Sequence, residues 1–465
     1  MSVVVALALT PFMIKELGQH QYGTWLLITS VAGFLQLLAL GAPVANVRYV
    51  AHAAARNDTR ELGDTLSLFL GGYLMISATS LVLGVGLVAL FPVFWDVPEP
   101  SLSQLALALV VAQWAVEHLL NWPRSALHAY GEFPMLSLAN MSVLLTRLGL
   151  MLYVLMACPT VLAVAAVMLF TTILHVLIVL GVLRKRHPHV YPLVKLRGLD
   201  CSKIGELVQY SLYVFTMNLG LQVASNSDAI VIAGFVGVSS IPFFAVANSM
   251  TVYLADLFGS MGNVMMPEAT RSYASGDMDA VRDLCLRWSK IAYSLAVFAG
   301  ATIAVIGADF LGIWIEAAYR ERSGVVLTIL TLSLVLYLPL RAVALPILLA
   351  IGQHRPTMWA LLLTSLLNVG LSILLAHPLG IVGVALGTAV QWVLLAGCLF
   401  ALITHHLGIS RREFLLYAFG RPTCAALALW FAVSEVRRLV GATSFLDLIV
   451  IGCASSVVFL VLWSG

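Results

Sequence analysis

The sequence reads AYGEFPM at Ala129–Met135 and AIGQHRPTM at Ala350–Met358, each time at the end of a long apolar segment. A second pair of similar stretches, RYVAHAAARNDTRELGDTL from Arg48 and RSYASGDMDAVRDLCL from Arg271, lies between two apolar segments in each case. Both pairs are offset by about 220 residues, and one spacing shared by two unrelated markers is typical of an internal repeat. We therefore predict a duplicated chain with two like lobes.

The apolar segments indicate the fold class. Hydrophobic residues make up 61% of the 465 residues and charged residues 10%, and the mean hydropathy is +0.99. So much apolar surface excludes a water-soluble protein and requires lipid as the solvent. Segments of about 20 residues, long enough to cross a bilayer, recur along the chain, and about 14 of them predict an all-α polytopic membrane protein. The predicted spans are 1–14, 22–45, 65–91, 103–121, 135–157, 160–183, 207–234, 241–267, 287–315, 324–350, 357–377, 379–403, 414–438 and 445–463.

The repeat and the spans together predict four parts of the chain. They are an N-terminal six-helix lobe at 1–183, a basic cytoplasmic linker at 184–206, a C-terminal six-helix lobe at 207–403 and two additional helices at 404–465. The first span is shorter than the bilayer is thick, so we expect its front to be truncated. An even number of helices per repeat gives both lobes one topology, related by an axis along the membrane normal, and predicts a transport pathway between them.

Lysine and arginine predict the orientation, because basic residues are retained on the cytoplasmic side. Of the 25 such residues, Arg147 and Arg341 lie inside predicted spans. Five lie in loops on one side, namely Lys15, Arg320, Arg322, Arg437 and Arg438, and the other 18 of the 25 lie on the opposite side. This asymmetry predicts that both termini are cytoplasmic.

Motifs for catalysis are absent from the sequence. It contains no GxxxxGK[ST] for nucleotide binding, and no HExxH or GxSxG, so we predict no enzyme, no catalytic residue, no metal and no cofactor. The six cysteines lack CxxC spacing and are expected to be free thiols. The predicted periplasmic loops are short, which disfavours a membrane polysaccharide polymerase or acyltransferase.

Three stretches resemble polysaccharide transporters of the O-antigen flippase type, within the multidrug, oligosaccharidyl-lipid and polysaccharide exporter superfamily. They are TPFMIKELGQHQYGTWLLITSVAGFLQLLALG at Thr10–Gly41, SDAIVIAGFVGVSSIPFFAVANSM at Ser227–Met250 and MMPEATRSYASGD at Met265–Asp277. The resemblance implies a flippase of the bacterial inner membrane that moves undecaprenyl-diphosphate-linked oligosaccharide by alternating access during polysaccharide biosynthesis. Implied partners are membrane lipids, a polysaccharide polymerase and a chain-length regulator, with a proton or sodium as coupling ion. An alternative within the superfamily is a cation-coupled drug or metabolite antiporter, for which a more acidic cavity is expected.

Polar residues inside the spans are the candidate site residues. A charged side chain at the centre of a span costs about 2.5–3.5 kcal/mol on insertion scales, so such residues usually face a cavity or one another. For substrate binding we predict Arg147, Arg341, Arg48, Arg124, Asn140, Asn218, Gln222 and Asn263. Arginine suits a diphosphate because its guanidinium binds phosphate oxygens bidentately. For ion coupling we predict Asp228, Asp256 and Glu117.

Several of these residues have a simpler alternative. Glu117 and Arg124 lie seven residues apart on one helix face, where an ion pair is expected. Asp256 could pair with an arginine to stabilise helix packing, and Asp228 could cap a structural element. Arg48, like Arg124, could act only as a cytoplasmic topology anchor.

Overall fold

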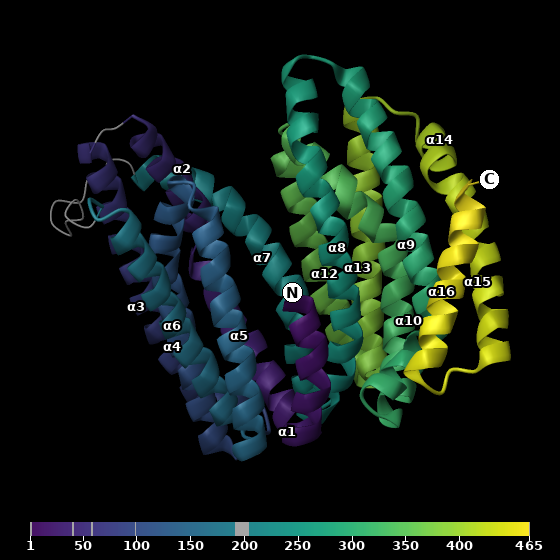
Figure 1. Ribbon diagram of the computed structural model, residues 1–465, viewed down its shortest axis with the longest axis horizontal. Coiled ribbons are helices and arrows are strands. Elements are labelled where there is room, and N and C mark those ends of the chain that lie inside the picture. The colour runs from purple at the N-terminus through teal and green to yellow at the C-terminus, as the bar shows by residue number, and fades with distance from the viewer. Residues whose placement is uncertain (1, 40, 57–58, 98, 191–203, 465) are drawn as a thin grey trace. The chain divides into compact units, whose positions relative to one another are not determined.

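The computed structural model describes residues 2–464 apart from 40, 57–58, 98 and 191–203 (Figure 1). Every regular element in this described part is helical, and it contains no strand. The all-α prediction is therefore confirmed. The chain forms two compact units, unit 1 at Met1–Ser239 and unit 2 at Ser240–Gly465.

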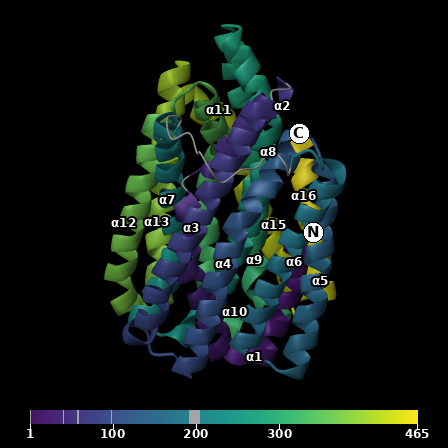
Figure 2. The same cartoon turned by 90° about the vertical axis from the view of Figure 1, so that its left-hand side faces the viewer.

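Unit 1 is built mainly of long helices. They are α1 at Ser2–Gly33, the 3₁₀ turn η1 at Phe34–Ala39, α2 at Ala42–Ala55, α3 at Thr59–Phe94, α4 at Pro100–Ala129, α5 at Phe133–Ala157, α6 at Val161–Arg186 and α7 at Ile204–Phe235. α4 packs on α3 and α6, and α5 packs on α6 (Figure 2). α7 packs on α1 and η1. The lobe limits predicted from the repeat stay a prediction.

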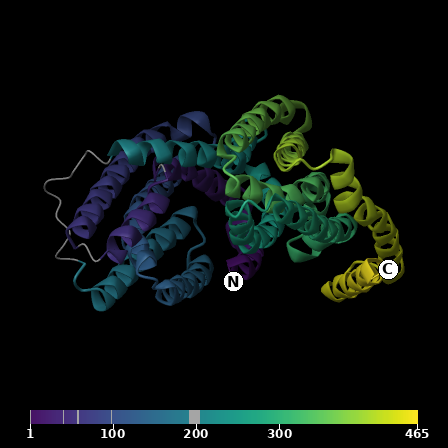
Figure 3. The same cartoon turned by 90° about the horizontal axis from the view of Figure 1, so that it is seen from above.

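The short 3₁₀ turn η4 at Val238–Ser240 ends at the first residue of unit 2. The elements of unit 2 are α8 at Ile241–Ala274, α9 at Met278–Trp314, α10 at Ala317–Pro339, the π-helical segment η5 at Leu340–Ala344, α11 at Leu345–Ala350, α12 at His354–Leu379, α13 at Ile381–Leu407, α14 at Arg411–Phe414, the π-helical segment η6 at Leu415–Gly420, α15 at Arg421–Val440 and α16 at Phe445–Ser464. α15 and α16, coloured yellow-green to yellow, lie at one side of unit 2 beside α9 (Figure 3).

Eleven helices in the described part of the chain are long and apolar enough to cross a membrane. The chain is therefore a multi-pass membrane protein. Seven predicted spans agree with the helices to within four residues at both ends, and five others stop six to nine residues short of one helix end. The span predicted at 22–45 is wrong at its end. The 3₁₀ turn stops at Ala39, Gly41 takes a left-handed backbone (φ 77°), and α2 begins at Ala42. The end of the span predicted at 1–14 and the start of the span predicted at 22–45 lie on either side of a kink in α1, where Gly18 has φ 74°.

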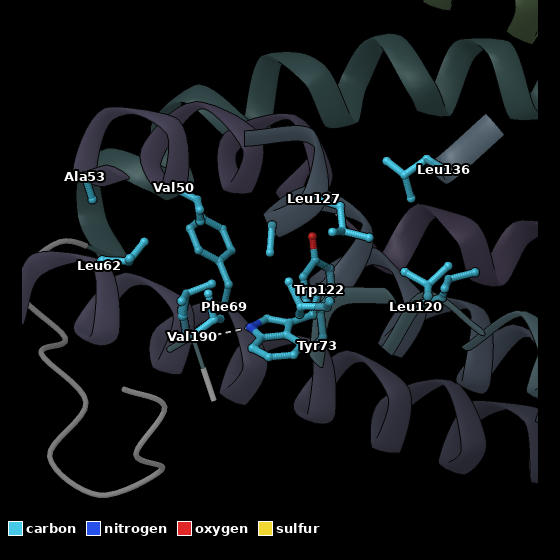
Figure 4. Packing of buried hydrophobic residues seen from close by; sticks show 14 of the residues in the cluster. Val50, Ala53, Leu62, Phe69, Tyr73, Leu120, Trp122, Leu127, Leu136 and Val190 are labelled. Carbon is cyan, nitrogen blue, oxygen red and sulfur yellow. Dashed lines mark hydrogen bonds between the residues drawn. The ribbon is translucent and has the colours of Figure 1, made fainter. Parts of the chain in front are cut away.

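A buried apolar cluster joins α2, α3, α4 and α6 at one end of unit 1 (Figure 4). The ring of Phe69 packs 6.5 Å from that of Tyr73, measured between centroids. The indole N–H of Trp122 on α4 donates to the Leu66 carbonyl on α3 at 2.9 Å. That bond satisfies the N–H of a buried indole and links α4 to α3.

Small and polar residues join α12 to α13 in unit 2. A methyl group placed on Gly383 would lie 2.0 Å from the Leu375 carbonyl oxygen, so the two helices approach closely at a GxxxG pattern ending at Gly387. Beside it, Gln391 donates to the Ser365 hydroxyl at 3.1 Å. Lipid provides no hydrophobic force between helices, so close packing and such bonds stabilise this pair.

A buried carboxylate ties α15 to the bundle of unit 2. The side chain of Asp309 on α9 is 0% exposed, and its oxygens lie 2.5 Å from the guanidinium of Arg320 on α10 and 2.7 Å from that of Arg437 on α15. Two cations compensate one desolvated anion, as a buried charge requires. The triad therefore fixes α15 against α9 and α10.

Candidate substrate-binding site

Arg147 lies on α5 and turns its side chain toward α6. Its Nε donates a hydrogen bond to the Thr171 hydroxyl oxygen at 3.0 Å. Thr171 is fully buried, and its hydroxyl donates in turn to the Val167 carbonyl at 2.8 Å within α6. The guanidinium is thus held by one edge. In the described part of the chain, the two terminal nitrogens of Arg147 make no hydrogen bond or ion pair.

The predicted ion pair on α4 is confirmed. An Arg124 terminal nitrogen lies 3.4 Å from a Glu117 carboxylate oxygen, and both side chains are a little under one-third exposed. Seven residues are two helical turns, so the pair runs along one face of α4. The carboxylate of Glu117 is also close enough to Arg147 for their charges to attract across α4 and α5.

His175 completes the group one turn further along α6 from Thr171. It is buried, its Nε2 has no hydrogen-bond partner among the described residues, and it lies within electrostatic range of Arg124 and Arg147. We call Glu117, Arg124, Arg147, Thr171 and His175 the α4–α6 cluster. With two guanidinium groups and one carboxylate, the cluster carries an excess of positive charge.

The cluster has the chemistry of an anion site. Thr171 orients one edge of the Arg147 guanidinium, and the opposite edge presents a fork of N–H donors that matches two oxygens of a phosphate group. The surroundings are membrane-spanning helices, where an unpaired guanidinium is costly and an anionic ligand compensates it.

The other predicted residues of unit 1 occupy different settings. Asn140 is exposed on α5 two turns before Arg147, and Arg48 is exposed on α2. Asn218 is exposed on α7. Asp228 is buried on the same helix, at 3% exposure. These four are not drawn into the α4–α6 cluster by any contact among the described residues.

Gln222 belongs instead to a contact between α7 and the end of α1. Its amide donates to the Gly33 carbonyl at 3.2 Å and to the Gln36 side-chain oxygen at 2.5 Å. Asn226 donates to Gln222 at 2.8 Å, one turn away. The sequence predicts Gln222 as a site residue, but it predicts neither Gln36 nor Asn226 as its partner.

Unit 2 holds the remaining predicted residues. Arg341 lies in the π-helical segment η5, is half-buried, and is within electrostatic range of Tyr337, whose ring stacks on Trp392 at 6.0 Å between centroids. π-Helical turns inside α-helices are frequent at functional sites. Asp256 is exposed on α8 without an ion pair in the described part. The side chain of Asn263 lies outside the described residues.

One small hollow of unit 1 lies apart from these residues. It is lined by Gln21, Thr24, Glu99, Leu102, Ser103, Thr160, Val161 and Leu162, which come from α1, the start of α4 and the start of α6. Glu99 there takes a left-handed backbone (φ 49°) as the N-cap of α4. None of the predicted site residues lines this hollow.

Comparison with known proteins gives the family. A family model described as "Polysaccharide biosynthesis protein" matches residues 3–272, more than half of the chain. The chain belongs to the polysaccharide biosynthesis protein family. Over 465 residues it is 21% identical to "Uncharacterized membrane protein EpsK" of Bacillus subtilis (strain 168), covering 98% of this chain and 90% of that protein.

Solved structures agree with the resemblance drawn from the sequence. The structure described as "Lipid II flippase MurJ, inward closed conformation" is similar with a TM-score of 0.79 at 15% identity, over 100% of this chain and 96% of that one. An inward-facing multidrug resistance MATE family transporter of the MOP superfamily has a TM-score of 0.77 at 16% identity, over 88% and 95%. The predicted superfamily resemblance is thus confirmed at the level of the fold.

Proposed function

We propose that this protein is a transporter, not an enzyme, and that it flips undecaprenyl-diphosphate-linked oligosaccharide from the inner to the outer leaflet of the bacterial inner membrane. The observation that carries the proposal is Arg147, held inside a span by Thr171 with the outer edge of its guanidinium unpaired in the described residues. Membership of the polysaccharide biosynthesis protein family supports a polysaccharide precursor as cargo. The fold shared with the lipid II flippase supports a lipid-linked one.

The charge of the α4–α6 cluster supports a diphosphate over a cationic drug. A diphosphate moved through a low-dielectric layer needs fixed positive charge, and bonds from a guanidinium to phosphate are among the stronger hydrogen bonds of proteins. Glu117, the acidic member of the cluster, is already paired with Arg124. A cation-coupled antiporter of the same superfamily would need an acidic binding surface in place of this cationic one.

Orientation and cycle follow from the same proposal. The basic-residue asymmetry supports cytoplasmic termini, so the lipid headgroup is received from the inner leaflet, with Arg48 and Arg124 as first contacts. The two lobes then expose the bound diphosphate to one leaflet at a time.

The remaining predicted residues have two proposed roles. Contacts to the diphosphate or to sugar hydroxyls are proposed for Arg341, Asn140, Asn218, Gln222 and Asn263. A coupling proton or sodium is proposed to bind at Asp228, Asp256 or Glu117. A polymerase with its chain-length regulator then receives the flipped lipid-linked oligosaccharide.

Surface polysaccharide in cells tests the proposal. A strain lacking this gene is complemented with wild type, Arg147→Ala, Arg147→Lys or Arg287→Ala, and membrane levels of each are checked by immunoblot. Arg287 is the control because it is exposed and paired with Asp283 in unit 2. We expect Arg147→Ala to abolish surface polymer, Arg147→Lys to restore part of it, and Arg287→Ala to match wild type. Normal polymer from Arg147→Ala would remove the α4–α6 cluster from the mechanism.

A further inference from the structure

Lys290 of α9 lies between two aromatic rings that come from distant parts of unit 2. Its ammonium is 5.2 Å from the centroid of the Tyr417 ring in η6 and 5.9 Å from that of Trp463 in α16. Both distances are in the range of cation–π attraction. The two rings remain 45% and 46% exposed, and Lys290 is half-buried between them.

Neighbouring contacts hold this arrangement in place. The hydroxyls of Tyr293 on α9 and Thr423 on α15 are 3.0 Å apart, and the Tyr293 ring packs 4.2 Å from that of Phe419, measured between centroids. The π-helical segment η6 is therefore fixed against α9 next to Lys290. Tyr417 belongs to this segment, and its ring lies over the ammonium.

Further cations flank η6, the segment that carries Tyr417, along the chain. Arg411, Arg412 and Arg421 are exposed at the starts of α14 and α15, with Glu413 as the acidic residue among them. In the described part of the chain, neither Lys290 nor any of these three arginines has an ion pair. The arginines of α9 differ, because Arg282 is paired with Asp279, and Arg287 with Asp283.

Apolar surface continues from these cations along α15 and α16. Leu416 beside Tyr417 is 62% exposed, and Phe431 and Leu460 are 64% and 62% exposed further along the two helices. The surface thus has a cationic, aromatic end and an apolar length. This is the pattern of a site for an amphipathic anion at a membrane interface, where rings lie at headgroup level and basic residues attract anionic lipid.

We propose that Lys290 and Arg421, with the rings of Tyr417 and Trp463, bind the phosphate headgroup of an anionic phospholipid, whose acyl chains lie along α15 and α16. We choose a phospholipid as the occupant because the surface that continues from the rings is apolar, with Leu415 and Leu416 beside Tyr417 48% and 62% exposed, and so provides a length of contact for acyl chains. The site is separate from the α4–α6 cluster, which belongs to unit 1. It therefore does not depend on the transported substrate.

Lipid binding to the full-length protein in detergent tests the proposal. Phosphatidylglycerol is titrated and the bound fraction is measured by native mass spectrometry, with phosphatidylcholine as the zwitterionic reference. The test variant is Lys290→Gln/Arg421→Gln. The control is Arg287→Gln/Arg438→Gln, which removes the same net charge from exposed arginines that are already paired with Asp283 and Glu435.

Each charge near a lipid surface contributes about 1 kcal/mol, which is about fivefold in affinity. We expect the test variant to lose about 25-fold in phosphatidylglycerol affinity, the control to lose none, and phosphatidylcholine to bind weakly to both proteins. Equal binding of the two lipids, equal losses in test and control variants, or no loss in either would overturn the site. Farnesyl diphosphate is added as a competitor, and displacement of phosphatidylglycerol that requires Lys290 would assign the site to the polyprenyl diphosphate instead.

Discussion

Thr171→Val tests whether the orientation of Arg147 matters for transport. Valine has nearly the shape of threonine but cannot accept the hydrogen bond from Arg147 Nε that the Thr171 hydroxyl accepts at 3.0 Å. The charge of Arg147 is unchanged, so any effect arises from the position of its guanidinium. We expect slower flipping with an unchanged amount of folded protein in the membrane.

The size of the effect follows from the strength of one bond inside a membrane. Hydrogen bonds between spans contribute about 0.6 kcal/mol on average and up to about 1.7 kcal/mol. A guanidinium donor belongs to the stronger end of hydrogen bonds. These values correspond to about a 3- to 20-fold decrease in the population of the oriented rotamer, and hence in the flipping rate. Removing the charge altogether has to reduce the rate further.

The neighbouring residue provides the matched control. Thr172 is buried on the same turn of α6, and its hydroxyl bonds to the Met168 carbonyl of its own helix at 2.9 Å. Thr172→Val therefore removes the same atoms without touching Arg147. Initial flipping rates are measured in proteoliposomes for both variants. A wild-type rate for Thr171→Val, or equal losses for the two variants, would refute a positioning role for Thr171.

Two predictions concern stability, measured as thermal unfolding of the purified protein in detergent. Asp309→Leu should lower the melting temperature less than the double variant Arg320→Met/Arg437→Met. The double variant leaves the buried carboxylate of Asp309 without a cation, and breaking a buried pair in this way costs about 3–5 kcal/mol. Asp309→Leu leaves only the two half-exposed arginines unpaired, and water can hydrate them. The opposite order would contradict the triad. Gly387→Leu should separate α12 from α13, since even a methyl group there would lie 2.5 Å from the Ser372 hydroxyl oxygen, whereas the same change at the open Gly397 should be tolerated. Equal melting temperatures for the two leucine variants would contradict close packing at Gly387.

Hydropathy predicted the spans well because each apolar run is about as long as the bilayer is thick. It did not predict the breaks within them. An average over a span carries no backbone geometry, so the kink at Gly18, the 3₁₀ turn after Gly33 and the π-helical segment η5 have no signal in it. Pro339 and Pro346 on either side of η5 are visible in the sequence, but they do not specify a π-helical turn.

Contacts between candidate site residues could be predicted when both residues lie on one helix, but not when they lie on different helices. Glu117 and Arg124 share a face of α4 by their spacing alone, and the ion pair is present. The partner of Arg147 is Thr171, 24 residues away on another helix, and no spacing rule connects α5 to α6. Asp309 is an acidic residue within the span predicted at 287–315 and could have been singled out, but its partners Arg320 and Arg437 come together only in the folded unit.

Flipping by the purified protein tests whether the α4–α6 cluster carries a lipid-linked glycan across the membrane. Lipid-linked oligosaccharide is placed in the inner leaflet of proteoliposomes, and its arrival outside is followed with a glycan-cleaving enzyme in the medium, with and without an imposed pH or sodium gradient. We predict that wild type exposes the glycan and that Arg147→Gln exposes it no faster than empty liposomes. Glycan exposure by Arg147→Gln at the wild-type rate, or none by folded wild-type protein under either gradient, would contradict this prediction.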